Sequence, residues 1–86
     1  RLRQVEEGEE RLHALGFQQL RLRHHGEIAR VEVDPSELHK ALDPEMAKAI
    51  AAAIKPLGFR YVSLDLEGYR SGALNEVLWP VRKQDE

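Results

Sequence analysis

Cysteine is absent from the 86 residues, so the chain holds no disulfide, no thiol nucleophile and no zinc site with thiolate ligands. Aromatic residues make up only 6% of the chain, and no apolar run approaches the ~18 residues that cross a bilayer. Neither sign of charge is in large excess, because 13 basic and 15 acidic side chains leave a net charge of −2. We therefore expect no membrane span and no sequence-independent binding of nucleic acid, and any anion site must be local.

The composition that remains is typical of a globular domain, with 42% hydrophobic and 33% charged residues. A chain of this length has room for one modest core. It opens on Arg1, inside what reads as the middle of a helix, and shows no secretory signal pattern. We expect residues 1–86 to be a single domain, a fragment of a longer, cytoplasmic protein that begins upstream.

Two periodicities divide the first half of the chain. Leu2, Val5, Leu12 and Leu15 follow a helical spacing, and Gly16 stands where a helix usually ends. From residue 17 on, apolar and polar residues alternate with a period of two. The alternation runs through residues 20–23, and it resumes through residues 29–33 after His24, His25 and Gly26. This pattern predicts a helix followed by a β-hairpin.

Two helix starts and a third strand follow. Asp34 and Asp43 each precede a proline, which predicts capped helix starts, with a short helix to Leu42 and a main helix that ends near residues 56–58. Residues 59–67 alternate again and predict a strand. A crossover through the main helix makes this strand parallel to the second.

The resulting fold class is α+β, a half-ferredoxin-like arrangement of a three-stranded sheet with helices on one face. One side of the sheet then forms the core, with Leu20, Leu22, Val31, Val33, Val62, Leu64 and Leu66. The other side carries Arg21, Arg23, Arg30, Glu32, Ser63 and Asp65.

The charged side contains the best candidate for an anion site. Arg21 and Arg23 stand two apart on one strand, so their guanidinium groups point the same way and are able to converge on one oxyanion. Arg30 on the neighbouring strand is a candidate third member. The alternative is a solvated surface on which these arginines pair with Glu32 and Asp65.

Other candidates are weaker. Glu9 lies among core-facing positions of the first helix, where it either faces a site, pairs with an arginine or is simply solvated, and Gly8 beside it weakens the helix. Arg70 lies in a loop with glycines at both ends, which suits either an anion contact or an ordinary turn. His24 and His25 point to opposite sides of a strand, so we expect no metal site from them, and no catalytic motif is present.

Several motifs together resemble a known family. They are R-x-R-H-H-G at residues 21–26, A-R-V-E at 29–32 and LDLEGYRSG-x-LNE at 64–76. They are similar to the C-terminal region of the ATP-dependent sacrificial sulfur transferases of the PP-loop superfamily, which make the nickel-pincer nucleotide of lactate racemase. The likeness covers most of the chain.

The resemblance implies an activity for the parent protein. Such enzymes use an N-terminal PP-loop domain, ATP and Mg²⁺ to convert a carboxylate of pyridinium-3,5-biscarboxylic acid mononucleotide to a thiocarboxylate. In many members the sulfur comes from a cysteine of the enzyme. This chain has neither a PP-loop nor a cysteine, so we expect those parts upstream and leave the sulfur donor open.

The resemblance also implies roles for particular residues. Arg21 and Arg23 match the basic pair that is implicated in holding the substrate phosphate, and Glu9 and Glu32 match acidic positions near the site. The family forms hexamers, and an apolar segment at Val77, Leu78 and Trp79 suits subunit contacts. Two other hypotheses remain: a stand-alone ligand-binding or oligomerisation module without catalysis, and an RNA-binding sheet on which Tyr61 and Phe59 stack bases.

Overall fold

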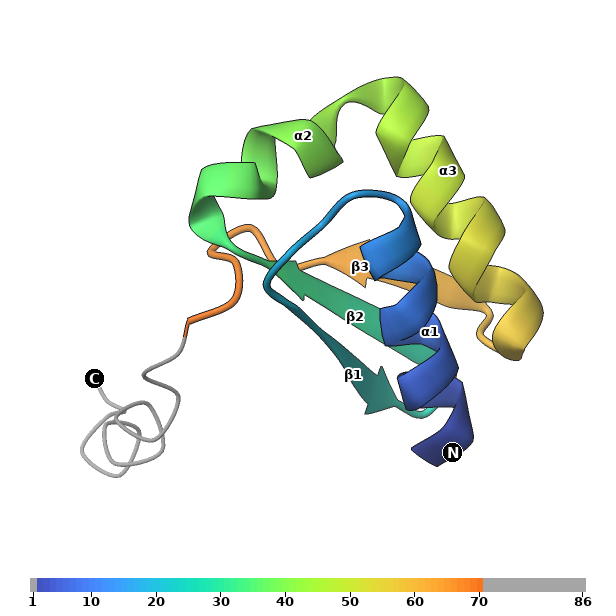
Figure 1. Ribbon diagram of the computed structural model, residues 1–86. Helices are drawn as coiled ribbons and strands as arrows, with labels where there is room; N and C mark the ends of the chain where they lie inside the picture. Colours follow the sequence, from blue (N-terminus) through green and yellow to red (C-terminus); the bar gives the residue numbers. More distant parts are fainter. Residues whose placement is uncertain (1, 71–86) are drawn as a thin grey trace, which may run out of the picture.

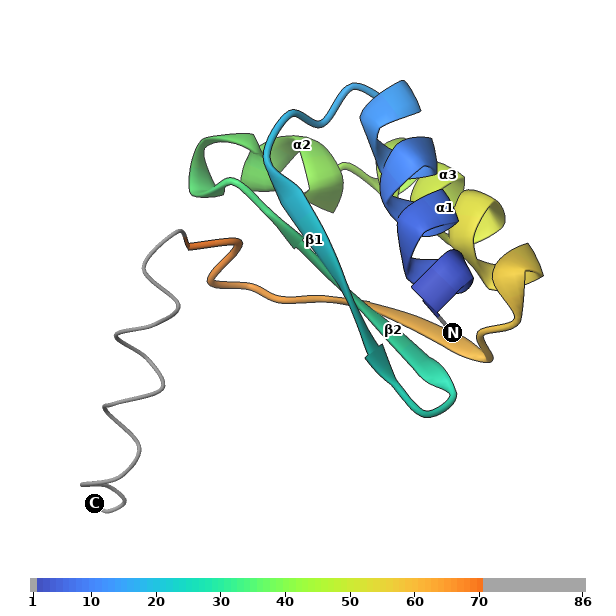
Figure 2. The same ribbon diagram turned by 60° about the horizontal axis from the view of Figure 1, so that its bottom comes forward.

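The computed structural model describes residues 2–70, which form a three-stranded sheet with all the helices on one face (Figures 1 and 2). The order is α1 (Leu2–Ala14), β1 (Leu20–His25), β2 (Ile28–Val33), a 3-10 turn η1 (Pro35–Glu37), α2 (Leu38–Leu42), α3 (Pro44–Ile54), a second 3-10 turn η2 (Lys55–Leu57) and β3 (Tyr61–Leu64). The predicted α+β class is confirmed.

The central strand of the sheet is β2. It pairs antiparallel with β1, placing Leu22 opposite Val31, and parallel with β3, placing Val31 opposite Leu64. The hairpin and the parallel third strand are therefore confirmed. The hairpin turn comprises only Gly26 and Glu27, and both histidines belong to β1.

The core lies between the sheet and the helices. Its largest fully buried side chains come from α1, the loop after it, α3 and β2: Leu12, Phe17, Ile54, Val31 and Val33. Six of the seven sheet residues predicted for the core are buried or partly buried there. The seventh, Leu66, is 69% exposed, so that prediction was wrong.

The third strand is shorter than predicted, because it stops at Leu64 instead of Glu67. Asp65 accepts a hydrogen bond from the Glu67 N–H at 2.9 Å through its side chain, and another from the Gly68 N–H at 3.0 Å through its carbonyl. These bonds turn the chain away from the sheet. Leu66 therefore lies in a turn on the surface.

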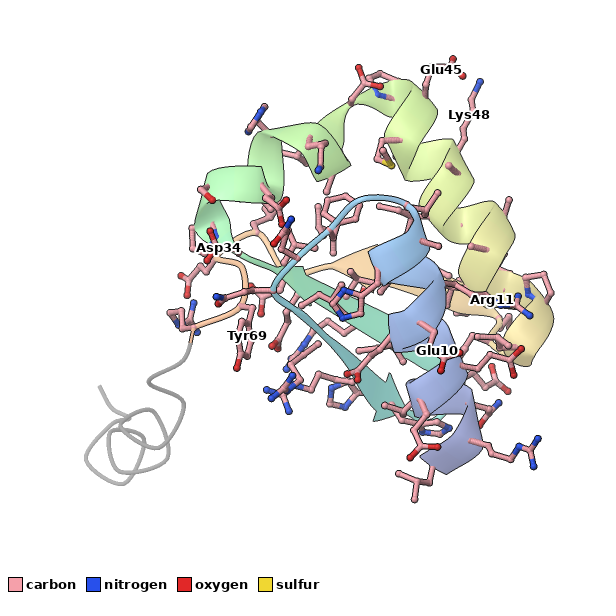
Figure 3. All side chains as sticks on the ribbon, in the orientation of Figure 1. Glu10, Arg11, Asp34, Glu45, Lys48 and Tyr69 are labelled. Carbon is pink, nitrogen blue, oxygen red and sulfur yellow. The ribbon has the colours of Figure 1, made fainter. Side chains whose placement is uncertain are left out.

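The two longest helices are joined by side chains of α1 that reach the end of α3 and η2. Arg11, which is labelled in Figure 3, donates to the Ala53 carbonyl at 2.7 Å. Gln4 donates to the Leu57 carbonyl at 2.8 Å. Both carbonyls lie where a helix end leaves acceptors unsatisfied. At the other end of α3, Asp43 accepts from the Glu45 and Met46 N–H groups, as the predicted N-cap requires.

Candidate functional site

The sheet face opposite the helices carries the charged residues, and we call it the arginine face. Cross-strand pairing sets Arg21 opposite Glu32, Arg23 opposite Arg30, and Arg30 opposite Ser63, so these side chains share one side of the sheet. Their placement confirms that Arg21 and Arg23 point the same way and that neither lies under the helices. The residues of the arginine face are Arg21, Arg23, Arg30, Glu32, Ser63 and Asp65.

A buried carboxylate lies at the centre of this face. Glu32 is only 6% exposed, although the helices of residues 2–70 lie on the other face of the sheet. Its Oε1 accepts from Arg23 Nε at 3.3 Å and its Oε2 accepts from Arg30 Nη2 at 2.9 Å. The aliphatic stems of arginines are able to cover such a group while their charged ends satisfy it. Glu32 thus holds two of the three guanidinium groups.

Arg30 also approaches a second carboxylate. Its Nε lies 3.9 Å from Asp65 Oδ2, which is an ion-pair distance but too long for a hydrogen bond. The Arg30 Nε atom is buried and has no hydrogen-bond partner among residues 2–70. The ion pairs of the alternative interpretation are thus present for Arg23 and Arg30, but the carboxylate that they share, Glu32, is buried and not solvated.

Arg21 differs from its two neighbours. It is exposed, and no carboxylate of residues 2–70 lies within ion-pair distance of it. Its Nη1 donates to the carbonyl of Leu20 at 3.2 Å, and its guanidinium carbon lies over the Tyr69 ring, 5.0 Å from the centroid. The cation of Arg21 is thus held in place without being neutralised.

Glu9 and Arg70 lie at the edges of this arrangement. Glu9, on α1, is half-buried, and its carboxylate accepts from the Leu22 N–H at 3.0 Å. It therefore satisfies a backbone donor of the edge strand β1, a contact that none of the three expectations for Glu9 included. Arg70 is exposed and pairs with Glu67 at 3.1 Å.

The two histidines lie on opposite sides of β1, as predicted. His24 packs edge-on against Phe59 with ring centroids 5.2 Å apart, whereas His25 is exposed. Within residues 2–70, no three acidic or histidine side chains are grouped as a metal site. Phe59 is only 4% exposed, so it offers no ring to a base, and the stacking role considered for it was wrong.

A cavity of about 200 Å³ lies on the helix side of the sheet. Its lining is apolar apart from Ser63 and consists of Val31, Ala41, Leu42, Ala47, Ile50, Ala51, Val62, Ser63 and Leu64. Since an anion needs a positive charge or several N–H donors, this cavity does not suit a phosphate. The arginine face is the better anion site in the described part of the chain.

Sequence reasoning missed Tyr69 as a member of the site. Its loop was noted only for Arg70 and for its glycines. The available signal was the turn sequence Asp65 to Gly68, in which Asp at the first position and Gly at the fourth are typical of a type I turn. Such a turn brings the next residue back to the sheet.

Two curated proteins match the chain. One, from Lactiplantibacillus plantarum, is named pyridinium-3,5-bisthiocarboxylic acid mononucleotide synthase and is 40% identical over 75 residues, which are 87% of this chain and 26% of that protein. The other, an uncharacterized protein of Synechocystis sp., is 37% identical over 78 residues, which are 91% of this chain and 29% of that protein. No family model matches. The chain thus spans between a quarter and a third of the length of these relatives.

Proposed function

We propose that this chain is the substrate-binding domain of an ATP-dependent sulfur transferase that acts on a pyridinium mononucleotide. In this proposal Arg21 and Arg23 bind the phosphate of the nucleotide. Support comes from the similarity to a protein named as a pyridinium bisthiocarboxylic acid mononucleotide synthase, and from the family motifs that contain both arginines.

The observation that carries the proposal is the state of Arg21. Its guanidinium is exposed on the arginine face and no carboxylate among residues 2–70 neutralises it. A guanidinium presents N–H donors in a planar fork that suits phosphate oxygens. Arg23, two residues along the same strand, adds a second guanidinium of which only Nε is engaged by Glu32.

The charge balance of the face also favours an anion. Three guanidinium groups stand against the two carboxylates of Glu32 and Asp65, which leaves a local excess of positive charge in a chain whose net charge is −2. This excess attracts a phosphate to one face of the sheet. It is too small to hold a long nucleic acid, which needs many phosphate contacts.

The proposal assigns catalysis to the rest of the protein. Adenylation of a carboxylate needs a phosphate-binding loop and Mg²⁺, and transfer of sulfur needs a donor, whereas these 86 residues contain neither a PP-loop motif nor a cysteine. We place the PP-loop domain upstream, as a partner of this domain in one chain. We further propose a cytoplasmic homo-oligomer; the segment at Val77, Leu78 and Trp79 that suggested subunit contacts lies outside the described residues.

The test is sulfur incorporation into the pyridinium mononucleotide by the intact protein that carries this chain. The double variant Arg21→Ala with Arg23→Ala is expected to lose most of the activity while it remains folded. A matched control, Arg3→Ala with Arg60→Ala, removes the same charge from exposed positions outside the arginine face. Full activity of the first double variant would refute the proposal.

A further inference from the structure

Tyr69 contacts Arg21 in a way that differs from how the other two arginines of the arginine face are held within residues 2–70. The guanidinium carbon of Arg21 lies 5.0 Å from the ring centroid of Tyr69, whereas Arg23 and Arg30 are held by the carboxylate of Glu32. Figure 3 shows the Tyr69 side chain projecting from the segment after β3, near the start of β1. The ring attracts the cation through its negative face.

The backbone fixes the position of this ring. The Tyr69 N–H donates to the carbonyl of Val33 at 2.6 Å, which ties the segment after β3 to the end of β2. Gly68 permits this close approach, because a Cβ at that position would lie 2.6 Å from the Val33 oxygen, and its φ of +81° disfavours any other residue. The backbone of this turn therefore holds the Tyr69 ring at the arginine face.

The same turn reaches a second arginine. It begins at Asp65, whose carboxylate lies 3.9 Å from Arg30 Nε. Residues 65–69 thus contact Arg30 at one end and Arg21 at the other. The turn that ends β3 is, in effect, one boundary of the anion site.

A ring and a carboxylate have different consequences for an arginine that must bind phosphate. A carboxylate accepts hydrogen bonds from the same in-plane N–H groups that a phosphate needs, and it cancels the charge. An aromatic ring contacts the face of the guanidinium and leaves its in-plane N–H groups free of hydrogen bonds to the ring. The contact also restricts the arginine side chain, which otherwise has considerable rotamer entropy. Holding Arg21 with Tyr69 therefore leaves the donors that do not bond to the Leu20 carbonyl available to a ligand.

We infer that Tyr69 is a positioning residue, which holds the Arg21 guanidinium in place for the oxyanion of a phosphate monoester. The inference rests on the proposed function, since it assigns to Tyr69 a part in the same anion site. It adds a residue from the turn after β3 to a site that is otherwise made of strand residues.

The test compares three single variants. Tyr69→Leu removes the ring, Tyr69→Phe keeps it, and Tyr61→Leu is a matched control that removes an exposed tyrosine of β3. The first measurement is the mobility of the Arg21 side chain, followed by NMR of its Nε–H group in the 86-residue chain. The second is the affinity of the intact protein for nicotinic acid mononucleotide and for the riboside that lacks its phosphate.

We expect Tyr69→Leu to increase the mobility of Arg21 and to weaken mononucleotide binding by about two- to fivefold, the range of an exposed cation–π contact. Riboside binding should not change. Tyr69→Phe and Tyr61→Leu should both behave as the wild type does.

Two results would overturn the inference. One is an Arg21 side chain that is equally ordered with and without the Tyr69 ring, which counts against positioning whether or not the protein binds nucleotide. The other is unchanged mononucleotide affinity in Tyr69→Leu although Arg21 has become mobile. A wild-type protein that does not distinguish mononucleotide from riboside would instead refute the proposed function itself, and with it the role given to Tyr69.

Discussion

At the scale of single residues, Glu32 decides how the three arginines differ. It lies directly opposite Arg21 in the strand register, yet its carboxylate bonds to Arg23 and to Arg30. Alternation along the strands predicted that all four residues share one side. It did not predict which arginine lacks a carboxylate partner within residues 2–70, because that depends on side-chain conformations and on the Tyr69 ring after β3.

Glu32→Ala should destabilise the fold. The substitution leaves two half-exposed arginines without their shared carboxylate, and we expect the free energy of unfolding to fall by about 1 to 3 kcal/mol. Urea denaturation measures this change. The control is Glu27→Ala, which breaks an ion pair with Arg60 whose side chains are 69% and 68% exposed and should cost less than about 1 kcal/mol. Equal losses in the two variants would contradict the structural role of Glu32.

At the scale of elements, the sequence predicted the order and type of the α-helices and strands found in residues 2–70. Prolines after Asp34 and Asp43 marked the helix starts, and both aspartates do accept backbone N–H bonds there. The end of β3 was the main error. Leu64 and Leu66 keep a strand period, but the turn at Asp65 competes with it and prevails, since it satisfies two backbone donors.

The elements η1 and α2 are tied to the loop before β1 by Glu37. Its carboxylate accepts from the Gln18 N–H at 3.0 Å and pairs with Lys40 at 3.3 Å. The Gln18 N–H is the main cause that lowers the pKa of Glu37 below its ordinary value of 4.5. Asp34 behaves alike, because the hydroxyl and the N–H of Ser36 lower its pKa below 3.8.

These shifts predict acid sensitivity of the fold. Since both carboxyl groups have a lower pKa in the folded state, their stabilisation is complete above the ordinary values and is lost as the pH falls through the folded pKa values. Glu37→Gln should therefore flatten the loss of stability below about pH 4.5. Urea unfolding at a series of pH values tests this, with Glu6→Gln on the exposed side of α1 as the control for lost charge. The prediction would be contradicted if Glu37→Gln and Glu6→Gln had the same effect on the slope of the free energy of unfolding against pH.

At the scale of the whole molecule, the two-layer arrangement follows from which faces are apolar. The sequence predicted that the helices lie on one side of the sheet. The structure adds that α1 packs closely against both the sheet and α3 (Figure 2), and this packing explains Gly8. Gly8 weakens α1 as a helix, but a Cβ there would lie 2.9 Å from Leu22 Cδ1 and 3.5 Å from Ile54 Cδ1. This contact was not predictable from helix periodicity, which treats glycine only as a weak helix former.

Gly8→Val should therefore force α1 away from its neighbours. The added methyl groups meet well-packed side chains, and we expect a loss of about 1 to 3 kcal/mol in the free energy of unfolding, in spite of the better helix propensity of valine. Ala14→Val adds similar bulk at an exposed position of the same helix and should change stability by no more than about 0.5 kcal/mol. Thermal or urea unfolding distinguishes the two, and a stable Gly8→Val variant would show that the layers are less tightly packed than described.

The most direct measurement of the whole account is calorimetric binding of nicotinic acid mononucleotide and its riboside to the intact protein. The wild type should prefer the mononucleotide by about tenfold or more, the worth of charge-assisted hydrogen bonds to phosphate. Arg21→Ala with Arg23→Ala should abolish that preference, whereas Arg3→Ala with Arg60→Ala should preserve it. A double variant without Arg21 and Arg23 that still prefers the phosphorylated ligand as the wild type does would contradict the account.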